Sequence, residues 1–173
     1  MRIGTVVGNP KEASRTLGVA GAVADAIASG IEAEGKGTAE RLVVDLATHA
    51  GRLFDWGAED VAALNTQVAR SDVVVVASPT FKATYTGMLK AFLDRYGNDG
   101  LAGTVAVPVM TGGAPVHALA PEVHLRPLLV ELGASVPTRG LFVLESQLPE
   151  LPTVVGKWAA GAVPLLLAAL SRH

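Results

Sequence analysis

Residues 73–77 read Val-Val-Val-Val-Ala, and this run decides the fold. β-Branched residues favour an extended strand, because their stiff side chains pack well on a pleated surface. The run is apolar at every position, so both faces of the strand must be covered. A strand of this kind is typical of the centre of a parallel sheet that carries helices on both sides.

Outward from this run, short β-branched segments alternate with longer segments of helical spacing. The predicted strands are Ile3–Val7, Arg41–Leu46, Val73–Ala77, Thr104–Met110 and Val136–Leu144. The predicted helices are Thr16–Ala33, Ala58–Ala69, Gly87–Tyr96, Val116–Leu132 and Val154–Leu170. This alternation indicates an α/β protein and fits either a flavodoxin-like sheet or a Rossmann-like half. We expect one domain over residues 1–173, with ligands at the carboxyl ends of the strands.

The composition excludes several classes of protein. Half of the residues are hydrophobic and 17% are charged, which argues against intrinsic disorder. The net charge of −2 argues against a nucleic-acid partner. The chain has no cysteine, so disulfides, thiolate catalysis and cysteine-bound metals are absent. The four histidines (His49, His117, His124 and His173) show no metal-ligand spacing.

The N-terminal residues indicate a strand and not a signal peptide, which needs a longer apolar stretch and a cleavage site. The most apolar segment, Ala159–Leu170, spans about a dozen residues, which is too short to cross a bilayer. We therefore expect a cytoplasmic protein without a membrane partner.

The loop after the first strand favours an anion. Ser14 and Thr16 stand at the start of the predicted helix, where unpaired N–H groups and the helix dipole attract negative charge. Arg15 adds a cation that can donate two hydrogen bonds to a phosphate. The alternative is an ordinary N-cap by Ser14 with Arg15 in solvent. Neither a Walker A motif nor a G-x-G-x-x-G motif occurs here.

The loops after the third and fourth predicted strands suit a flat ring. Pro79 ends the third strand, and Thr80 and Phe81 follow it with backbone amides and an aromatic face. Gly112 and Gly113 after the fourth strand permit close backbone approach or positive φ. Each loop alone also fits a plain structural role, but all three are expected at one edge of the sheet.

At this point the chain resembles the NAD(P)H-dependent FMN reductase family of flavodoxin-like proteins. It is especially similar to reductases that supply reduced FMN to alkanesulfonate-type monooxygenases. The resemblance runs from Met1 to about Gln147 and is densest in residues 78–90 and in Thr111-Gly112-Gly113…His117…Leu125-Arg126-Pro127. It implies a three-layer sandwich around a five-stranded parallel sheet in the order 2-1-3-4-5.

The resemblance also implies roles for particular residues. Ser14, Arg15 and Thr16 match the loop that binds the FMN phosphate, and Asn9, where relatives usually have Ser, can still bond phosphate. The other matches are Pro79, Thr80, Phe81 and Lys82 beside the ribityl chain and flavin ring, and Thr111, Gly112, Gly113 and His117 in the loop at the pyrimidine end. Phe81 replaces a usual Tyr, and Val123 and His124 lie where monooxygenase-coupled members carry a Tyr or His that influences flavin exchange.

The implied reaction is hydride transfer from NADPH or NADH to flavin N5, which needs stacked rings rather than an acid–base pair. Family members are typically homodimers or tetramers, and a flavin-dependent monooxygenase is an expected partner. The apolar surface of residues 116–132 and of the C-terminal segment also favours a homo-oligomer. The alternatives are a quinone or azo reductase with held FMN, a flavodoxin-type electron carrier, and a flavin-free interaction domain.

Overall fold

The computed structural model describes residues 1–171, so His173 lies outside the described residues. The strands are β1 (Arg2–Val7), β2 (Glu40–Asp45), β3 (Val73–Pro79), β4 (Val105–Gly112) and β5 (Leu141–Leu144). The α-helices are α1 (Arg15–Ala33), α2 (Glu59–Ala69), α3 (Gly87–Leu93), α4 (Arg126–Glu131) and α5 (Leu151–Leu170). Short turns of other helix types are η1 (Leu46–Arg52), η2 (Pro115–His117), η3 (Pro121–Leu125) and η4 (Glu145–Glu150).

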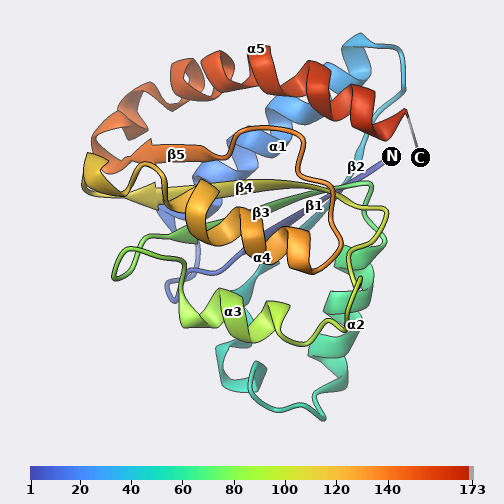
Figure 1. Cartoon of the computed structure of the whole chain (residues 1–173), viewed down its shortest axis with the longest axis vertical. Coiled ribbons are helices and arrows are strands. Elements are labelled where there is room, and N and C mark those ends of the chain that lie inside the picture. Colours follow the sequence, from blue (N-terminus) through green and yellow to red (C-terminus); the bar gives the residue numbers. More distant parts are fainter. Residues whose placement is uncertain (172–173) are drawn as a thin grey trace.

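The five strands form one parallel sheet in the order β2-β1-β3-β4-β5. Figure 1 shows α1 and α5 on one face of this sheet and α2, α3 and α4 on the other. The predicted flavodoxin-like order and the three layers are therefore confirmed, and a Rossmann-like half is excluded. β1 lies between β2 and β3, so the chain order reverses there and a topological switch point results.

The central strand is buried on both faces, as its sequence predicts. All seven residues of β3 are buried. Val73, Val75 and Ala77 pack with α1 and α5, whereas Val74 and Val76 pack with the helices of the opposite layer. Each large apolar side chain that folding removes from water contributes about 1.5–3 kcal/mol. Two hydrophobic cores, one on each face, thus hold the sheet.

The predicted helix Val116–Leu132 is wrong as a single element. The structure has a 3₁₀ turn at Pro115–His117, a π-helical turn at Pro121–Leu125 and a short α-helix at Arg126–Glu131. Prolines at 121 and 127 lack the N–H group that a continuous helix needs, so each begins a new segment. The predicted helix Gly87–Tyr96 is also shorter and ends at Leu93.

The last two strands differ from their predicted bounds. β4 continues through Thr111 and Gly112 because these residues pair with β5. β5 covers only Leu141–Leu144, and the predicted start at Val136 is wrong. The Arg126 guanidinium donates to the carbonyl oxygens of Val136 and Thr138 and thereby occupies them outside the sheet.

Two helical stretches are long and apolar enough to cross a membrane, α1 and Glu145–Leu170. α1 packs against both the sheet and α5, which is typical of a core helix. Only 17% of the stretch that ends in α5 is buried, and it is longer than the dozen residues that the sequence suggested.

Candidate functional site

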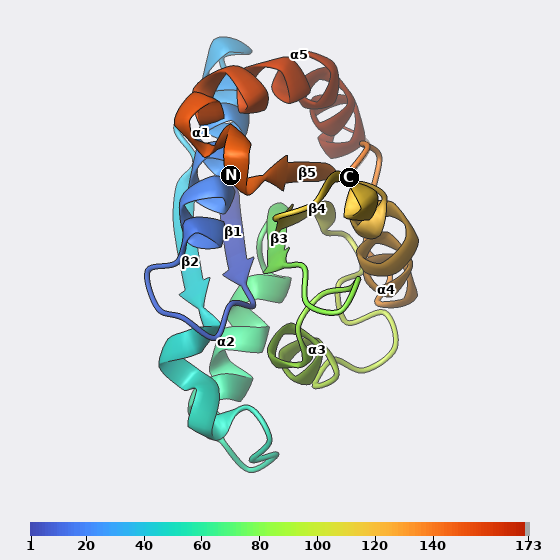
Figure 2. The ribbon, with the colours of Figure 1, turned by 90° about the vertical axis from the view of Figure 1, so that its left-hand side faces the viewer.

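The carboxyl ends of β1, β3 and β4 meet at one edge of the sheet, which faces the viewer in Figure 2. A pocket of about 270 Å³ opens at this edge. It is lined by Asn9, Lys11, Ala13, Ser14, Arg15, Thr16, Pro79, Phe81, Thr111 and Glu145. Segments that lie more than 60 residues apart in the sequence therefore contribute to one site.

The first loop is held by its own polar side chains. The Asn9 side-chain amide donates to Thr16 Oγ1 at 3.1 Å, and its oxygen accepts from the Lys11 N–H at 2.9 Å. Thr16 Oγ1 also lies 2.9 Å from Thr111 Oγ1, which ties α1 to the end of β4. Thr16 is only 1% exposed, so its hydroxyl serves this link within the protein. The bonds fix the loop geometry before any ligand arrives.

Ser14 is the N-cap of α1, as the alternative interpretation of this loop proposes. Its Oγ accepts from the Leu17 N–H at 3.2 Å, and its carbonyl oxygen accepts from the Gly18 N–H. Among residues 1–171, the N–H groups of Arg15 and Thr16 then have no hydrogen-bond acceptor. These two amides and the positive end of the α1 dipole face the pocket, and both favour an anion.

The charged side chains at the pocket mouth have mixed signs. The side chain of Arg15 is 71% exposed and forms an ion pair of 3.1 Å with Glu145, which follows β5 directly. Lys11 supplies a second cation to the lining. The Arg15 side chain is therefore paired with Glu145 but stays accessible to a ligand from solvent.

The loop that follows β1 is tied to α3 through Thr86. Its Oγ1 donates to the Gly8 carbonyl oxygen at 2.6 Å and accepts from the Leu89 N–H at 3.1 Å. Its own N–H donates to Ser78 Oγ at 3.0 Å. A Cβ atom at Gly8 would lie 2.4 Å from Leu89 Cβ, so only glycine lets the first loop pass α3 this closely.

The second loop makes a tight reversal at Phe81–Thr84. The N–H of Phe81 donates to the Thr84 carbonyl oxygen at 2.9 Å, and Lys82 and Ala83 hold φ of +51° and +71°. Positive φ at both central positions is the geometry of a type I′ turn, which usually requires Asn or Gly. The turn holds the Phe81 ring at the pocket with half of its surface exposed.

Thr80 lies below this turn and carries a buried hydroxyl. Its backbone N–H donates to the Thr111 carbonyl oxygen at 2.7 Å, but its Oγ1 has no partner among the described residues. A buried hydroxyl without a partner costs about 1–3 kcal/mol. This atom lies beside Gly112, where an added Cβ would come within 3.3 Å of it.

The two glycines of the third loop have different roles. Neither holds positive φ, so that alternative for the Gly pair is wrong. Gly112 is closely packed, since a Cβ there would lie 2.8 Å from the far end of the Phe142 ring, which would have to shift. A Cβ at Gly113 would meet no atom within 4 Å, so space is open above its backbone. A flat ligand has room to approach there.

The structure brings together seven of the twelve predicted site residues. Asn9, Ser14, Arg15, Thr16, Pro79, Phe81 and Thr111 line the pocket. Thr80, Gly112 and Gly113 lie beside it, Lys82 is exposed on the turn, and His117 lies in the 3₁₀ turn that follows the third loop. Lys11, Ala13 and Glu145 were missed. Glu145 could have been found, because it directly follows β5 at the same edge of the sheet.

Other parts of the described chain suit this chemistry less well. A larger hollow of about 560 Å³ lies between α2 and the residues that follow α3. It lies far from the strand ends and has no helix N-terminus among its lining. Within residues 1–171, no cluster of three His, Cys, Asp or Glu side chains could hold a metal ion. The small pocket at the strand ends is the better candidate, with a cradle for a phosphate-like anion next to an aromatic wall.

Comparison with known proteins agrees with this description. The model of the family described as "NADPH-dependent FMN reductase" matches residues 1–148. The chain is 40% identical over 91 residues to "FMN reductase (NADPH)" of Escherichia coli (strain K12), a match over 51% of this chain and 48% of that protein. It is 32% identical over 98 residues to an NADH-dependent FMN reductase of Pseudomonas putida, covering 55% and 53%. These matches span about half the length of the curated relatives.

Solved structures show the same fold over nearly the whole chain. An oxidoreductase from Corynebacterium diphtheriae superposes with a TM-score of 0.84 at 25% identity and covers 97% of this chain and 98% of that one. The apo form of an NADH:FMN oxidoreductase gives a TM-score of 0.74 at 24% identity, with coverage of 92% and 88%.

Proposed function

Because the chain belongs to the NADPH-dependent FMN reductase family, we propose that it uses NADPH or NADH to reduce FMN. FMN held in the pocket would supply the group that accepts hydride, at N5, from the nicotinamide. The observation that carries this proposal is the pocket at the strand ends, where an anion cradle adjoins an aromatic wall.

The residues present fit FMN. The free amides of Arg15 and Thr16, with Lys11 and the Arg15 guanidinium nearby, suit the phosphate of FMN. The partnerless Thr80 Oγ1 can bond the polar groups of the ribityl chain or of the flavin edge. The open space over Gly113 leaves room for the ring.

When bound, FMN supplies the hydride-accepting chemistry, and the side chains need only bind, orient and exclude water. Phe81 covers one end of the pocket with an apolar ring, and the type I′ turn keeps that ring in place. The bonded network of Asn9, Thr16 and Thr111 keeps the phosphate cradle in register with the sheet. Catalysis then rests on holding the nicotinamide and the flavin face to face.

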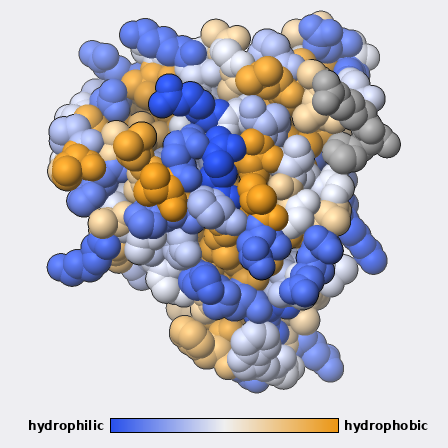
Figure 3. Space-filling view, in the orientation of Figure 1, coloured by the Kyte–Doolittle hydropathy of each residue, from blue (hydrophilic) through white to orange (hydrophobic). Residues whose placement is uncertain are grey.

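The assembly and the location also belong to this proposal. We infer a homodimer or tetramer, because Val116, Leu119, Val123 and Val130, all between η2 and the end of α4, are between 54% and 80% exposed. Figure 3 shows several hydrophobic side chains in orange on the side of the molecule that carries α4. We also propose a cytoplasmic enzyme that passes reduced flavin to a monooxygenase; the names of its relatives give the reduction of FMN as their activity.

The test is the oxidation of NADPH and of NADH at 340 nm, on protein stripped of flavin, with and without added FMN. Oxidation that rises with free FMN and saturates supports the reductase. FMN binding without NAD(P)H oxidation would replace it with the electron carrier. Oxidation that needs an added quinone or azo dye, with flavin that survives dialysis, would replace it with the quinone or azo reductase.

A further inference from the structure

We propose that Glu145 competes with the phosphate of FMN for Arg15 and so keeps the flavin exchangeable. The inference rests on the proposed function and concerns the same pocket. It assigns Glu145 as the residue that weakens flavin binding, so that FMN serves as a released substrate rather than a held prosthetic group.

The ion pair spans the pocket mouth. Arg15 is the first residue of α1 and Glu145 is the first residue after β5, and both line the pocket. Arg15 Nη1 lies 3.1 Å from Glu145 Oε2. The Glu145 carboxylate therefore pairs with the Arg15 guanidinium, the cation next to the two free amides of the α1 N-terminus.

The backbone of Glu145 is held where the pair needs it. The strand before it, β5, ends at Leu144 next to the buried residue Val143, and the Leu144 N–H donates to Gln147 Oε1 at 3.0 Å. The start of η4 is thereby fixed at the edge of the sheet. The Glu145 side chain stays 57% exposed, so it can move when an anion arrives.

The charges indicate the direction of the effect. A phosphate carries up to two negative charges and favours Lys11, Arg15 and the α1 N-terminus, whereas a carboxylate beside them repels it. An exposed ion pair contributes little to the stability of a protein, so FMN can break it. Binding must nevertheless disrupt the pair or tolerate the extra charge, and both lower the affinity.

The experiment compares FMN affinity of the wild type and of Glu145→Gln, measured by quenching of flavin fluorescence. We expect Glu145→Gln to bind FMN about three- to tenfold more tightly, the range for removal of one partly screened charge contact. The release of FMN, followed after rapid dilution, should slow by a similar factor. Riboflavin lacks the phosphate, so its affinity should not change.

The matched control is Glu131→Gln, which removes an equal charge from an exposed position at the end of α4, outside the pocket. It should leave FMN affinity unchanged. In an Arg15→Ala background, Glu145→Gln should lose most of its effect, because the competition acts through Arg15. Unchanged or weaker FMN binding by Glu145→Gln would overturn the inference. A gain in FMN affinity of the same size in the Arg15→Ala background would also overturn it.

A failure of the proposed function gives a different result. If neither the wild type nor Glu145→Gln binds FMN, the assignment of the pocket to flavin is wrong and the inference is overturned together with it. If the wild type binds and reduces FMN but Glu145→Gln shows no gain, only the role of Glu145 is wrong.

Discussion

At the scale of single residues, Tyr96 shows how burial alters a side chain. Its hydroxyl donates to the Asn65 carbonyl oxygen at 3.0 Å, and its ring meets the Phe92 ring edge-on at 6.1 Å. Burial raises the pKa of Tyr96 to about 12. The unfolded chain ionises this phenol near pH 10, so high pH favours the unfolded state.

This raised pKa predicts a loss of stability in alkali. The contribution of Tyr96 is complete below about pH 10 and is lost as the pH rises toward 12, because the unfolded state releases the proton first. Urea unfolding at pH 9 and at pH 11 measures it. The wild type should lose more unfolding free energy between these pH values than Tyr96→Phe, which has no phenol to ionise. Equal losses would contradict the shift.

Single residues also show how far sequence reasoning reaches. The hydroxyls at Ser14, Thr16 and Thr80 could be predicted to lie at the strand ends, because each follows or precedes a recognisable element. The hydrogen-bond partners of these hydroxyls could not be predicted, because Thr16, for example, bonds to Thr111, which lies 95 residues away in the sequence. The Arg15–Glu145 pair joins residues 130 positions apart, and only the folded sheet brings them together.

At the scale of elements, the segment between β4 and β5 is organised by one arginine. Arg126 donates through Nε to Glu122 at 2.6 Å and through Nη1 to the Val136 carbonyl oxygen at 2.6 Å. The Arg126 guanidinium in turn holds the pKa of Glu122 below its usual range. The alternation of apolar runs predicted one helix and one strand between β4 and the end of β5. It carries no information on the crosslink that Arg126 forms with Glu122 and with the residues before β5. The bounds of both elements were therefore wrong.

The crosslink predicts that Arg126→Met lowers the free energy of unfolding by about 2–3 kcal/mol, because Glu122 and two carbonyl groups lose a charged donor. Urea unfolding at neutral pH measures the change. Arg70→Met, at an exposed position after α2, should cost much less. Equal losses in the two variants would show that the crosslink contributes little to stability.

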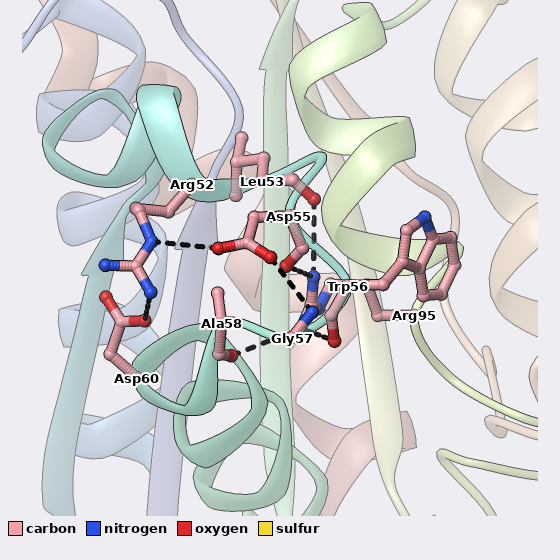
Figure 4. Close-up of polar contacts among 8 residues, drawn as sticks. All are labelled: Arg52, Leu53, Asp55, Trp56, Gly57, Ala58, Asp60 and Arg95. Atoms are coloured by element: carbon pink, nitrogen blue, oxygen red, sulfur yellow. Dashed lines mark hydrogen bonds and ion pairs between the residues drawn. The ribbon is translucent and has the colours of Figure 1, made fainter.

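A second arginine shapes the loop between η1 and α2, as Figure 4 shows. Arg95 donates to the carbonyl oxygens of Leu53, Asp55, Trp56 and Ala58 at 2.8–3.4 Å. Its guanidinium also lies 5.6 Å from the centre of the Trp56 ring. The planar fork of arginine can serve several carbonyl groups at once, whereas an ammonium group cannot.

Arg95→Lys is therefore expected to loosen this loop and to lower the free energy of unfolding by about 1–2 kcal/mol. Limited trypsin digestion should cleave faster after Arg52, which begins the loop. Arg139→Lys, exposed before β5, is the control and should digest like the wild type. FMN affinity should not change, because the loop lies outside the pocket. If Arg95→Lys is digested at the same rate as the wild type, Arg95 does not hold this loop in place.

At the scale of the whole molecule, apolar surface is distributed unevenly. The two cores and the central strands β3 and β4 are fully buried, whereas Val116, Leu119 and Val123 in the η2–η3 segment are exposed. Hydrophobic periodicity predicts the alternating strands and helices, because each apolar run needs a covering layer, and the order of the sheet follows from the family resemblance. The division of the η2–α4 segment into short helical turns could not be predicted in this way, because it depends on where prolines interrupt a helix.

The exposed segment predicts self-association. Sedimentation at tens of micromolar should show a dimer or tetramer, because the contiguous side chains would otherwise remain in water. Val123→Glu should shift the protein toward the monomer. Phe54→Glu, at a 77% exposed position in the loop after η1, should not. A monomeric wild type would contradict the prediction.

The turn beside the pocket has a consequence for adaptation to heat. Ala13, Lys82 and Ala83 all hold positive φ, a conformation that costs an ordinary residue about 1–2 kcal/mol. Selection for growth at high temperature would be expected to recruit glycine or asparagine at these positions before it altered the core. Proteins from heat-adapted lineages would then differ from this chain first in the residues around the pocket. Adaptation to temperature would therefore change the same loops that bind the ligand.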